Sequence, residues 1–322
     1  MSTPCQQFPV VTIVGDKLVT ASHSGPQRFF AAGMVLSGGG APQLSGYDAA
    51  RVRLVLEEHR RLGATVLRWN AFLKGVDFEW GRDGHIVGLV PGCFEAVRRG
   101  LDDALSHGVL VQVVLATAHF LRFGWGGPEN TLGGIKNRDR VVNIQRMMSS
   151  SAGIDAYIER VLDPLLEAIG PHPALMGFLI VNEGYAMVRK AEKALSSETD
   201  ATIGLSDLQR WVNRVAGAIH RSLPGALLSS SLKLMVSDRW HERKGLLPLA
   251  LWFEDEALVK AGGDVDGTLD LHQYQYYPET TMGEEDSPFL NTVQELRELH
   301  KSPMAKPMLC GEFPIEGLSQ VR

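Results

Sequence analysis

The chain places an amide and a carboxylate side by side at the end of an apolar segment. The stretch HPALMGFLIVNEG carries an uninterrupted apolar run from Leu175 to Val181, which ends at Asn182 and Glu183. A buried carboxylate is costly unless it is paired or hydrogen-bonded. The run therefore predicts either an incidental strand end or a strand whose role is to present this pair.

Other short apolar segments also end in polar side chains. A second carboxylate, Glu312, lies near the end of the stretch KPMLCGEF. The remaining candidates at segment ends are Arg68, Asn70, His119, His272 and Tyr274. If the segments are parallel strands, all of these side chains converge at the carboxyl end of the sheet. Two carboxylates facing each other there suit cleavage of a glycosidic bond, because one can protonate the leaving oxygen while the other attacks as a nucleophile.

The neighbouring polar residues fit supporting roles in that chemistry. Arg68 and Tyr274 could hold Glu312 in its ionised form by charge and hydrogen bonding. Asn182 could donate a hydrogen bond to a sugar hydroxyl beside the reacting carbon, and this bond would strengthen as charge develops. His272 could instead be a satisfied core histidine, and Tyr274 a packing residue.

Short apolar segments alternate with amphipathic ones along the chain. Besides the segment that ends at Asn182, strands are expected at 28–36, 64–70, 109–117, 226–234, 267–277 and 306–313. Helices are expected at 47–63, 93–108, 154–170, 205–225 and 291–302. Strands that are buried on both faces and alternate with helices indicate parallel βα units. Seven such units predict an α/β fold of the (β/α)8 TIM-barrel type.

Long polar or glycine-rich loops follow the strands, at 71–92, 118–153, 184–204 and 235–250. In a barrel these loops lie at the carboxyl face, where active sites form. Trp125 lies in the second of them, and an indole face packs well on a pyranose ring. A tryptophan in such a loop can equally hold the loop itself in place.

The same strand ends resemble those of a known family. The stretch HPALMGFLIVNEG looks like the fourth-strand signature of clan A retaining glycoside hydrolases, specifically glycoside hydrolase family 5, which contains cellulases and mannanases. KPMLCGEF is similar to the family's seventh-strand stretch, LDLHQY to its His-x-Tyr motif, and VLRWN to its second-strand arginine. The resemblance spans about residues 28–315, in the expected strand order.

The resemblance implies a role for each matching residue. Glu183 would be the acid/base and Glu312 the nucleophile. Arg68, His119, Asn182, His272 and Tyr274 would contact the substrate or the nucleophile. The chain departs from the family where Gly184 replaces the usual proline, where Phe178 replaces a tryptophan, and where LATAH lacks an aspartate. The expected activity is that of a retaining β-glycosidase on β-linked glucan or mannan chains, without a cofactor or metal.

Composition is ordinary for a globular protein of 322 residues, with 44% hydrophobic and 21% charged residues. The net charge of −5 and the scattered Lys and Arg residues argue against a nucleic-acid partner. No apolar run approaches the ~20 residues of a membrane span. The three cysteines, Cys5, Cys93 and Cys310, are too few and too widely spaced for a disulfide framework or a zinc cluster.

The two ends of the chain carry further expectations. No signal peptide is visible at the N-terminus, which fits a cytoplasmic protein or a processed secreted form. Residues 8–20 are expected to form a hairpin at the barrel bottom. The chain stops soon after its seventh strand, so we expect one catalytic domain over 1–322 that is truncated before an eighth βα unit. The alternative to an enzyme is a carbohydrate-binding barrel without turnover, and the oligomeric state is open.

Overall fold

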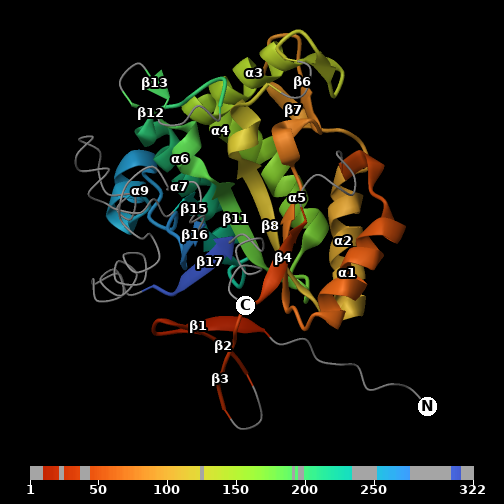
Figure 1. Cartoon of the computed structure of the whole chain (residues 1–322). Helices are drawn as coiled ribbons and strands as arrows, with labels where there is room; N and C mark the ends of the chain where they lie inside the picture. Colours follow the sequence, from red (N-terminus) through yellow and green to blue (C-terminus); the bar gives the residue numbers. More distant parts are fainter. Residues whose placement is uncertain are drawn as a thin grey trace, which may run out of the picture.

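Parallel strands at the centre of the molecule carry the polar strand ends. The computed structural model describes residues 10–21, 25–36, 44–123, 127–190, 193–194, 199–233, 252–275 and 306–312. Its central strands are β4 (Gly33–Leu36), β5 (Val66–Asn70), β8 (Leu110–Thr117), β11 (Leu175–Asn182), β14 (Leu227–Ser229), β15 (Ser231–Lys233), β16 (His272–Gln275) and β17 (Met308–Glu312). They form two parallel sheets of order β14-β11-β8-β5-β4 and β15-β16-β17 (Figure 1).

One segment of chain joins these two sheets. β14 pairs with β11, β15 pairs with β16, and only Ser230 separates β14 from β15. β14 and β15 are therefore two halves of one strand that contributes to both sheets. The strands occupy seven consecutive positions of a (β/α)8-type barrel, in the order predicted from the sequence.

Helices cover the outer face of this wall (Figure 1). The helices of the layer are α1 (Ala49–Arg61), α2 (Cys93–His107), α3 (Asn137–Ser149), α4 (Ser151–Tyr157), α5 (Asp163–Ile169), α7 (Leu205–Ser222) and α9 (Asp255–Gly262). A π-helical turn at Ile158–Leu162 connects α4 and α5. No helix in the described ranges combines the length and the apolarity needed to cross a membrane.

The ends of these helices follow local rules that the sequence displays. The Asp48 carboxylate accepts a hydrogen bond of 3.1 Å from the backbone N–H of Arg51 and caps α1. Gly108 ends α2 in the left-handed conformation, with φ of 74°, which glycine adopts at little cost. The cap at Asp48 fixes where α1 begins, and Gly108 lets the chain turn from α2 directly into β8.

Alternate residues of each strand face opposite sides of the wall. Those facing the helices, such as Trp69, Val113 and Phe178, pack in the main hydrophobic core. A second core lies at the amino ends of the strands, where Val66, Leu110, Met176, Leu227 and Leu271 pack on Val11 and Leu18. Val11 and Leu18 belong to the N-terminal sheet of β1 (Val11–Val14), β2 (Lys17–Thr20) and β3 (Gln27–Arg28), which lies below the barrel (Figure 1).

The segments after the strands are more ordered than the loops expected from the sequence. After β5 comes the hairpin β6 (Phe78–Trp80) and β7 (Ile86–Leu89), and after β8 come β9 (Thr131–Leu132), β10 (Ile135–Lys136) and α3. α3 was missed because it lies in a polar stretch, yet its Val141, Ile144 and Met148 are buried. After β11 come α6 (Gly184–Met187), β12 (Arg189–Lys190) and β13 (Lys193–Ala194).

Candidate active site

Polar side chains fill the middle of the barrel interior. Gln112 on β8 donates from Nε2 to Ser229 Oγ at 3.1 Å and to Gln273 Oε1 at 3.0 Å. The Ser229 hydroxyl donates to the same Gln273 oxygen at 2.8 Å. All three side chains are at least 96% buried. This layer links the third, fifth and sixth strands beneath the carboxyl ends.

A second polar cluster, above the first, surrounds Asn182. The Ser231 hydroxyl donates to Asn182 Oδ1 at 2.9 Å, and Gln275 Nε2 donates to the same oxygen at 2.6 Å. Ser231 Oγ also accepts the backbone N–H of Glu183 at 3.1 Å. The amide oxygen of Asn182 is thus occupied by protein donors, which directs its NH2 group elsewhere. The cluster fixes the two residues that end the fourth strand.

Glu183 has an unusual backbone conformation. Its φ of 58° places it in the left-handed region, where non-glycine residues are uncommon. The next residue, Gly184, begins the short helix α6. Such strain persists where the surroundings impose it and is frequent at functional sites. Here it turns the chain sharply after Asn182, and the Glu183 side chain remains partly exposed at the carboxyl end of the barrel.

The second predicted carboxylate reaches this region through its backbone. Glu312 is paired in register with Gln275, the residue that donates to Asn182. The Glu312 side chain lies outside the described part of the chain, so the distance between the two carboxylates remains a prediction. Arg68 crosses the barrel and donates from Nη1 to the carbonyl oxygen of Gly311 at 2.9 Å. Arg68 therefore contacts the residue immediately before Glu312, near the place predicted for it.

His272 and Tyr274 alternate along β16 with two glutamines that bond inside the barrel. Gln273 and Gln275 point into the barrel, so the alternating residues His272 and Tyr274 lie on the opposite face of β16. Burial lowers the pKa of His272, and the nearby positive charge of Lys306 lowers it further. Burial raises the pKa of Tyr274, and its hydrogen bond with Cys310 adds to the rise.

The missed residues could have been found from a weak signal. Gln112, Ser229, Ser231, Gln273 and Gln275 interrupt otherwise apolar strands. In the stretch HQYQ either alternating pair could have faced the barrel, and the structure selects the two glutamines. The carboxamide of Gln275 thus occupies a place beside Asn182 for which the sequence motif indicated other side chains.

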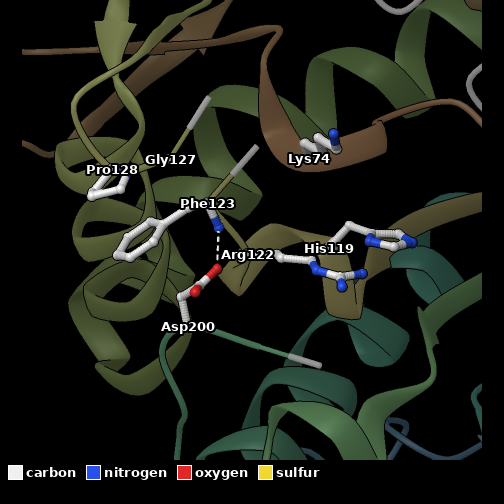
Figure 2. Close-up of a pocket in the computed structure, with 7 residues that line it drawn as sticks. All are labelled: Lys74, His119, Arg122, Phe123, Gly127, Pro128 and Asp200. Carbon is white, nitrogen blue, oxygen red and sulfur yellow. Dashed lines mark hydrogen bonds between the residues drawn. The ribbon is translucent and has the colours of Figure 1, made fainter. Parts of the chain in front are cut away.

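His119 lies in the short 3-10 turn η3 (Ala118–Leu121) after β8. The backbone N–H of His119 donates to Thr117 Oγ1 at 3.1 Å. It lines a pocket of about 530 Å³ (Figure 2). The other lining residues are Lys74, Arg122, Phe123, Gly127, Pro128 and Asp200. The turn η3 contacts α6, which begins directly after Glu183. The turn that carries His119 therefore packs against the helix that follows Glu183, whereas Trp125 lies outside the described residues.

Within the ranges given above, no group of three or more His, Cys, Asp or Glu side chains is arranged to hold a metal ion.

Comparison with known proteins bears on this architecture. No protein-family profile matches the chain. A mannan endo-1,4-β-mannosidase of Mytilus edulis is 25% identical over 248 residues, which is 73% of this chain and 60% of the relative. The chain thus spans less than two thirds of the length of that relative.

Solved structures agree with the fold. The β-mannanase of the blue mussel Mytilus edulis has a TM-score of 0.70 at 21% identity, over 96% of this chain and 84% of that one. The β-1,4-D-mannanase of Cryptopygus antarcticus has a TM-score of 0.70 at 18% identity, over 95% and 80%. The fold is of the (β/α)8-barrel type, with seven strand positions formed by the described residues, and the strand ends carry the polar site. The resemblance to clan A glycoside hydrolases of family 5 is confirmed, and it is to their β-mannanases that this chain is similar.

Proposed function

We propose that the protein is a retaining glycoside hydrolase that cleaves β-1,4-linked mannan. The observation that carries this proposal is the cluster at the end of β11, where Ser231 and Gln275 fix Asn182 beside Glu183 and the backbone register brings Glu312 to Gln275. The similarity to β-mannanases supports the substrate class.

In this proposal the two glutamates have different roles. Glu183 protonates the glycosidic oxygen while Glu312 attacks the anomeric carbon, so that the leaving sugar departs and a covalent glycosyl-enzyme forms. Glu183 then removes a proton from water, which attacks the same carbon and releases Glu312. Two displacements retain the configuration, and they require carboxyl groups ~5–5.5 Å apart.

Asn182 fits a role in stabilising the transition state. Its amide oxygen accepts hydrogen bonds from Ser231 and Gln275, so its NH2 group can donate to the sugar hydroxyl next to the anomeric carbon. Such a donor acts most strongly when charge develops on the sugar. Arg68, held against the carbonyl of Gly311, supplies positive charge close to the position of Glu312 and would favour its ionised form.

The experiment is hydrolysis of β-1,4-mannan and of manno-oligosaccharides by the wild-type protein and by the Glu312→Gln variant, with proton NMR of the first product. We expect hydrolysis by the wild type, a product of retained configuration, and loss of turnover in the variant. An inverted product contradicts the assigned roles. Binding of mannan without hydrolysis by the wild type would instead support the carbohydrate-binding alternative.

A further inference from the structure

The pocket beside His119 gathers positive charge. Lys74 follows β5 and Arg122 follows β8, and both side chains line the pocket. The Arg122 side chain extends toward His119 (Figure 2). Among the described residues, Arg122 forms no ion pair with a carboxylate. Two cations brought together in one concave site repel each other and favour an anion between them.

A buried arginine holds these two cations in place. The Arg140 guanidinium, which is fully buried, donates from Nη1 to the carbonyl oxygen of Lys74 and from Nη2 to that of Arg122, the latter at 2.6 Å. Nη1 also reaches the Phe120 carbonyl at 3.4 Å. Arg140 thus ties together the backbones of both pocket cations and adds a third positive charge behind them.

The backbone and titration of Lys74 agree with a built site. Its φ of 63° makes it, with Glu183, one of two non-glycine residues in the left-handed region within the described ranges. Burial lowers the pKa of its ammonium group, and the charges of Arg140 and Arg122 lower it further. Holding a cation in a strained conformation near two others costs stability, and such strain is frequent where binding compensates for it.

Of the described residues that line the pocket, Asp200 is the carboxylate that opposes these charges. Asp200 lines the pocket, and its side chain accepts a hydrogen bond from the backbone N–H of Phe123 (Figure 2). Its charge is therefore partly satisfied by that N–H. Among the described residues, the two cations that line the pocket and the buried Arg140 behind them outnumber this carboxylate. A neutral sugar can accept hydrogen bonds from these cations but forms no ion pair, whereas a sugar that carries an anionic group forms both.

We propose that this pocket is a subsite for an acidic group on the glycan, a carboxylate of a uronic acid residue or a sulfate ester. The inference rests on the proposed function, because it places the acidic residue of the chain next to the bond that Glu183 and Glu312 cleave. Arg122 offers paired N–H donors that match the two oxygens of such a group, and Lys74 adds a point charge. Phe123, Gly127 and Pro128 form the less polar wall of the pocket.

The test is calorimetric titration with three β-1,4-manno-oligosaccharides of equal length, one neutral, one with a single residue oxidised to the uronic acid, and one with a single sulfate ester. We expect at least one acidic ligand to bind about tenfold more tightly than the neutral ligand at low salt, as hydrogen bonds to charged groups predict. The carboxylated and sulfated ligands distinguish the two sources of the anion. The preference should weaken as the ionic strength rises.

Three variants locate the preference. Arg122→Gln and Lys74→Met should each bring the affinity ratio of acidic to neutral ligand close to one, while Arg60→Gln, an exposed cation on α1, should leave the ratio unchanged. Arg122 is exposed, so its variant keeps the test valid if Lys74→Met does not fold. Equal affinity of the wild type for neutral and acidic ligands overturns the subsite but leaves the proposed function standing. A preference that survives both pocket substitutions also overturns it, and failure to bind any of the three ligands overturns both proposals.

Discussion

The Gln275 side chain donates a hydrogen bond of 2.6 Å to the amide oxygen of Asn182. This bond joins β16, the sixth strand, to the end of β11, the fourth. Neither side chain is more than 5% exposed. A buried amide whose oxygen is held by two donors has one orientation, so its NH2 group has one direction. This contact makes Gln275 a positioning residue for Asn182 in the proposed reaction.

Replacement of Gln275 by leucine should therefore impair the proposed hydrolysis more than the fold. Loss of one positioning hydrogen bond should cost about 1–3 kcal/mol of transition-state stabilisation, or roughly a five- to 150-fold lower kcat, with a smaller change in KM. Steady-state kinetics on manno-oligosaccharides measures this split. The matched control is Gln209→Leu, which removes a hydrogen bond of 2.8 Å to the Trp252 carbonyl away from the site. Similar kinetics for the two variants would contradict the role of Gln275.

Ser231 and Gln275 should act as one unit, because both donate to the same Asn182 oxygen. A double-mutant cycle with Ser231→Ala and Gln275→Leu tests this. We expect the loss of transition-state stabilisation in the double variant to be smaller than the sum of the single losses by at least about 0.5 kcal/mol. Additive losses would show that the two side chains act independently.

Removal of the Glu183 carboxyl group should affect substrates unequally. Glu183→Ala should lose most of its activity on manno-oligosaccharides but retain cleavage of aryl β-mannosides with acidic phenol leaving groups, since these need little protonation. Glu312→Ala should lose activity on both. Parallel assays of the two variants on both substrate types provide the measurement. An equal loss on activated and natural substrates by Glu183→Ala would count against its role as the acid.

Gly177 permits close packing of β11 against β14. A Cβ atom at this position would lie 1.9 Å from the carbonyl oxygen of Leu227, which is backbone and cannot rotate away. Gly177→Ala should lower the free energy of unfolding by about 3 kcal/mol or prevent folding, as overpacking does. The control is Gly225→Ala, where nothing lies within 4 Å, and a change of less than about 1 kcal/mol is expected. Urea unfolding of both variants gives the comparison.

His220 at the end of α7 should make stability depend on pH. Its hydrogen bond with the Asp270 carboxylate, of 3.2 Å, is the main cause of a raised pKa, and its bond to the Asp266 carbonyl adds to the rise. A raised pKa in the folded state means that the stabilisation is fully present below the ordinary value of about 6.5. The stabilisation is lost as the pH rises through the folded-state pKa.

The measurement is the free energy of unfolding of the wild type and of His220→Gln. The stability advantage of the wild type should be larger near pH ~5.5 than near pH ~8.5, because only the imidazolium gains from the Asp270 charge. Asp270→Asn should remove most of this pH dependence, and the part that Asp266 contributes should remain. An advantage that grows with rising pH would show that the neutral imidazole is the form the fold favours.

Regular alternation of apolar and amphipathic segments was sufficient to predict the parallel wall. β8 at Leu110–Thr117 and β11 at Leu175–Asn182 agree closely with the expected strands because both are buried on each face. The expected helix at 154–170 corresponds to α4, the π-helical turn and α5, which begin earlier, at Ser151. Segments without strong periodicity, such as β6 and β7, were not predicted, because tertiary contacts rather than local pattern stabilise them.

The candidate site was predicted in part. Asn182, Glu183, Arg68 and the backbone of Glu312 lie where strand order placed them, since the ends of parallel strands meet at one face. The sequence of β16 did not predict which of its faces points into the barrel, because both faces carry polar side chains: His272 and Tyr274 on one, Gln273 and Gln275 on the other. The hydrogen bonds of Gln273 with Gln112 and of Gln275 with Asn182 show that the two glutamines face the barrel interior.

The hydrogen bond from Arg68 to the Gly311 carbonyl joins positions 243 residues apart in the sequence. Closing a flexible loop of that length costs about 5 kcal/mol of chain entropy beyond a constant, and contacts of this kind slow folding. The β5–β8–β11 wall, whose pairings are more local, can form long before β17 arrives. During synthesis from the N-terminus, Glu183 would thus be in place while its predicted partner had not yet been translated. In the proposed reaction, both glutamates would then be present only after most of the described hydrophobic core had formed.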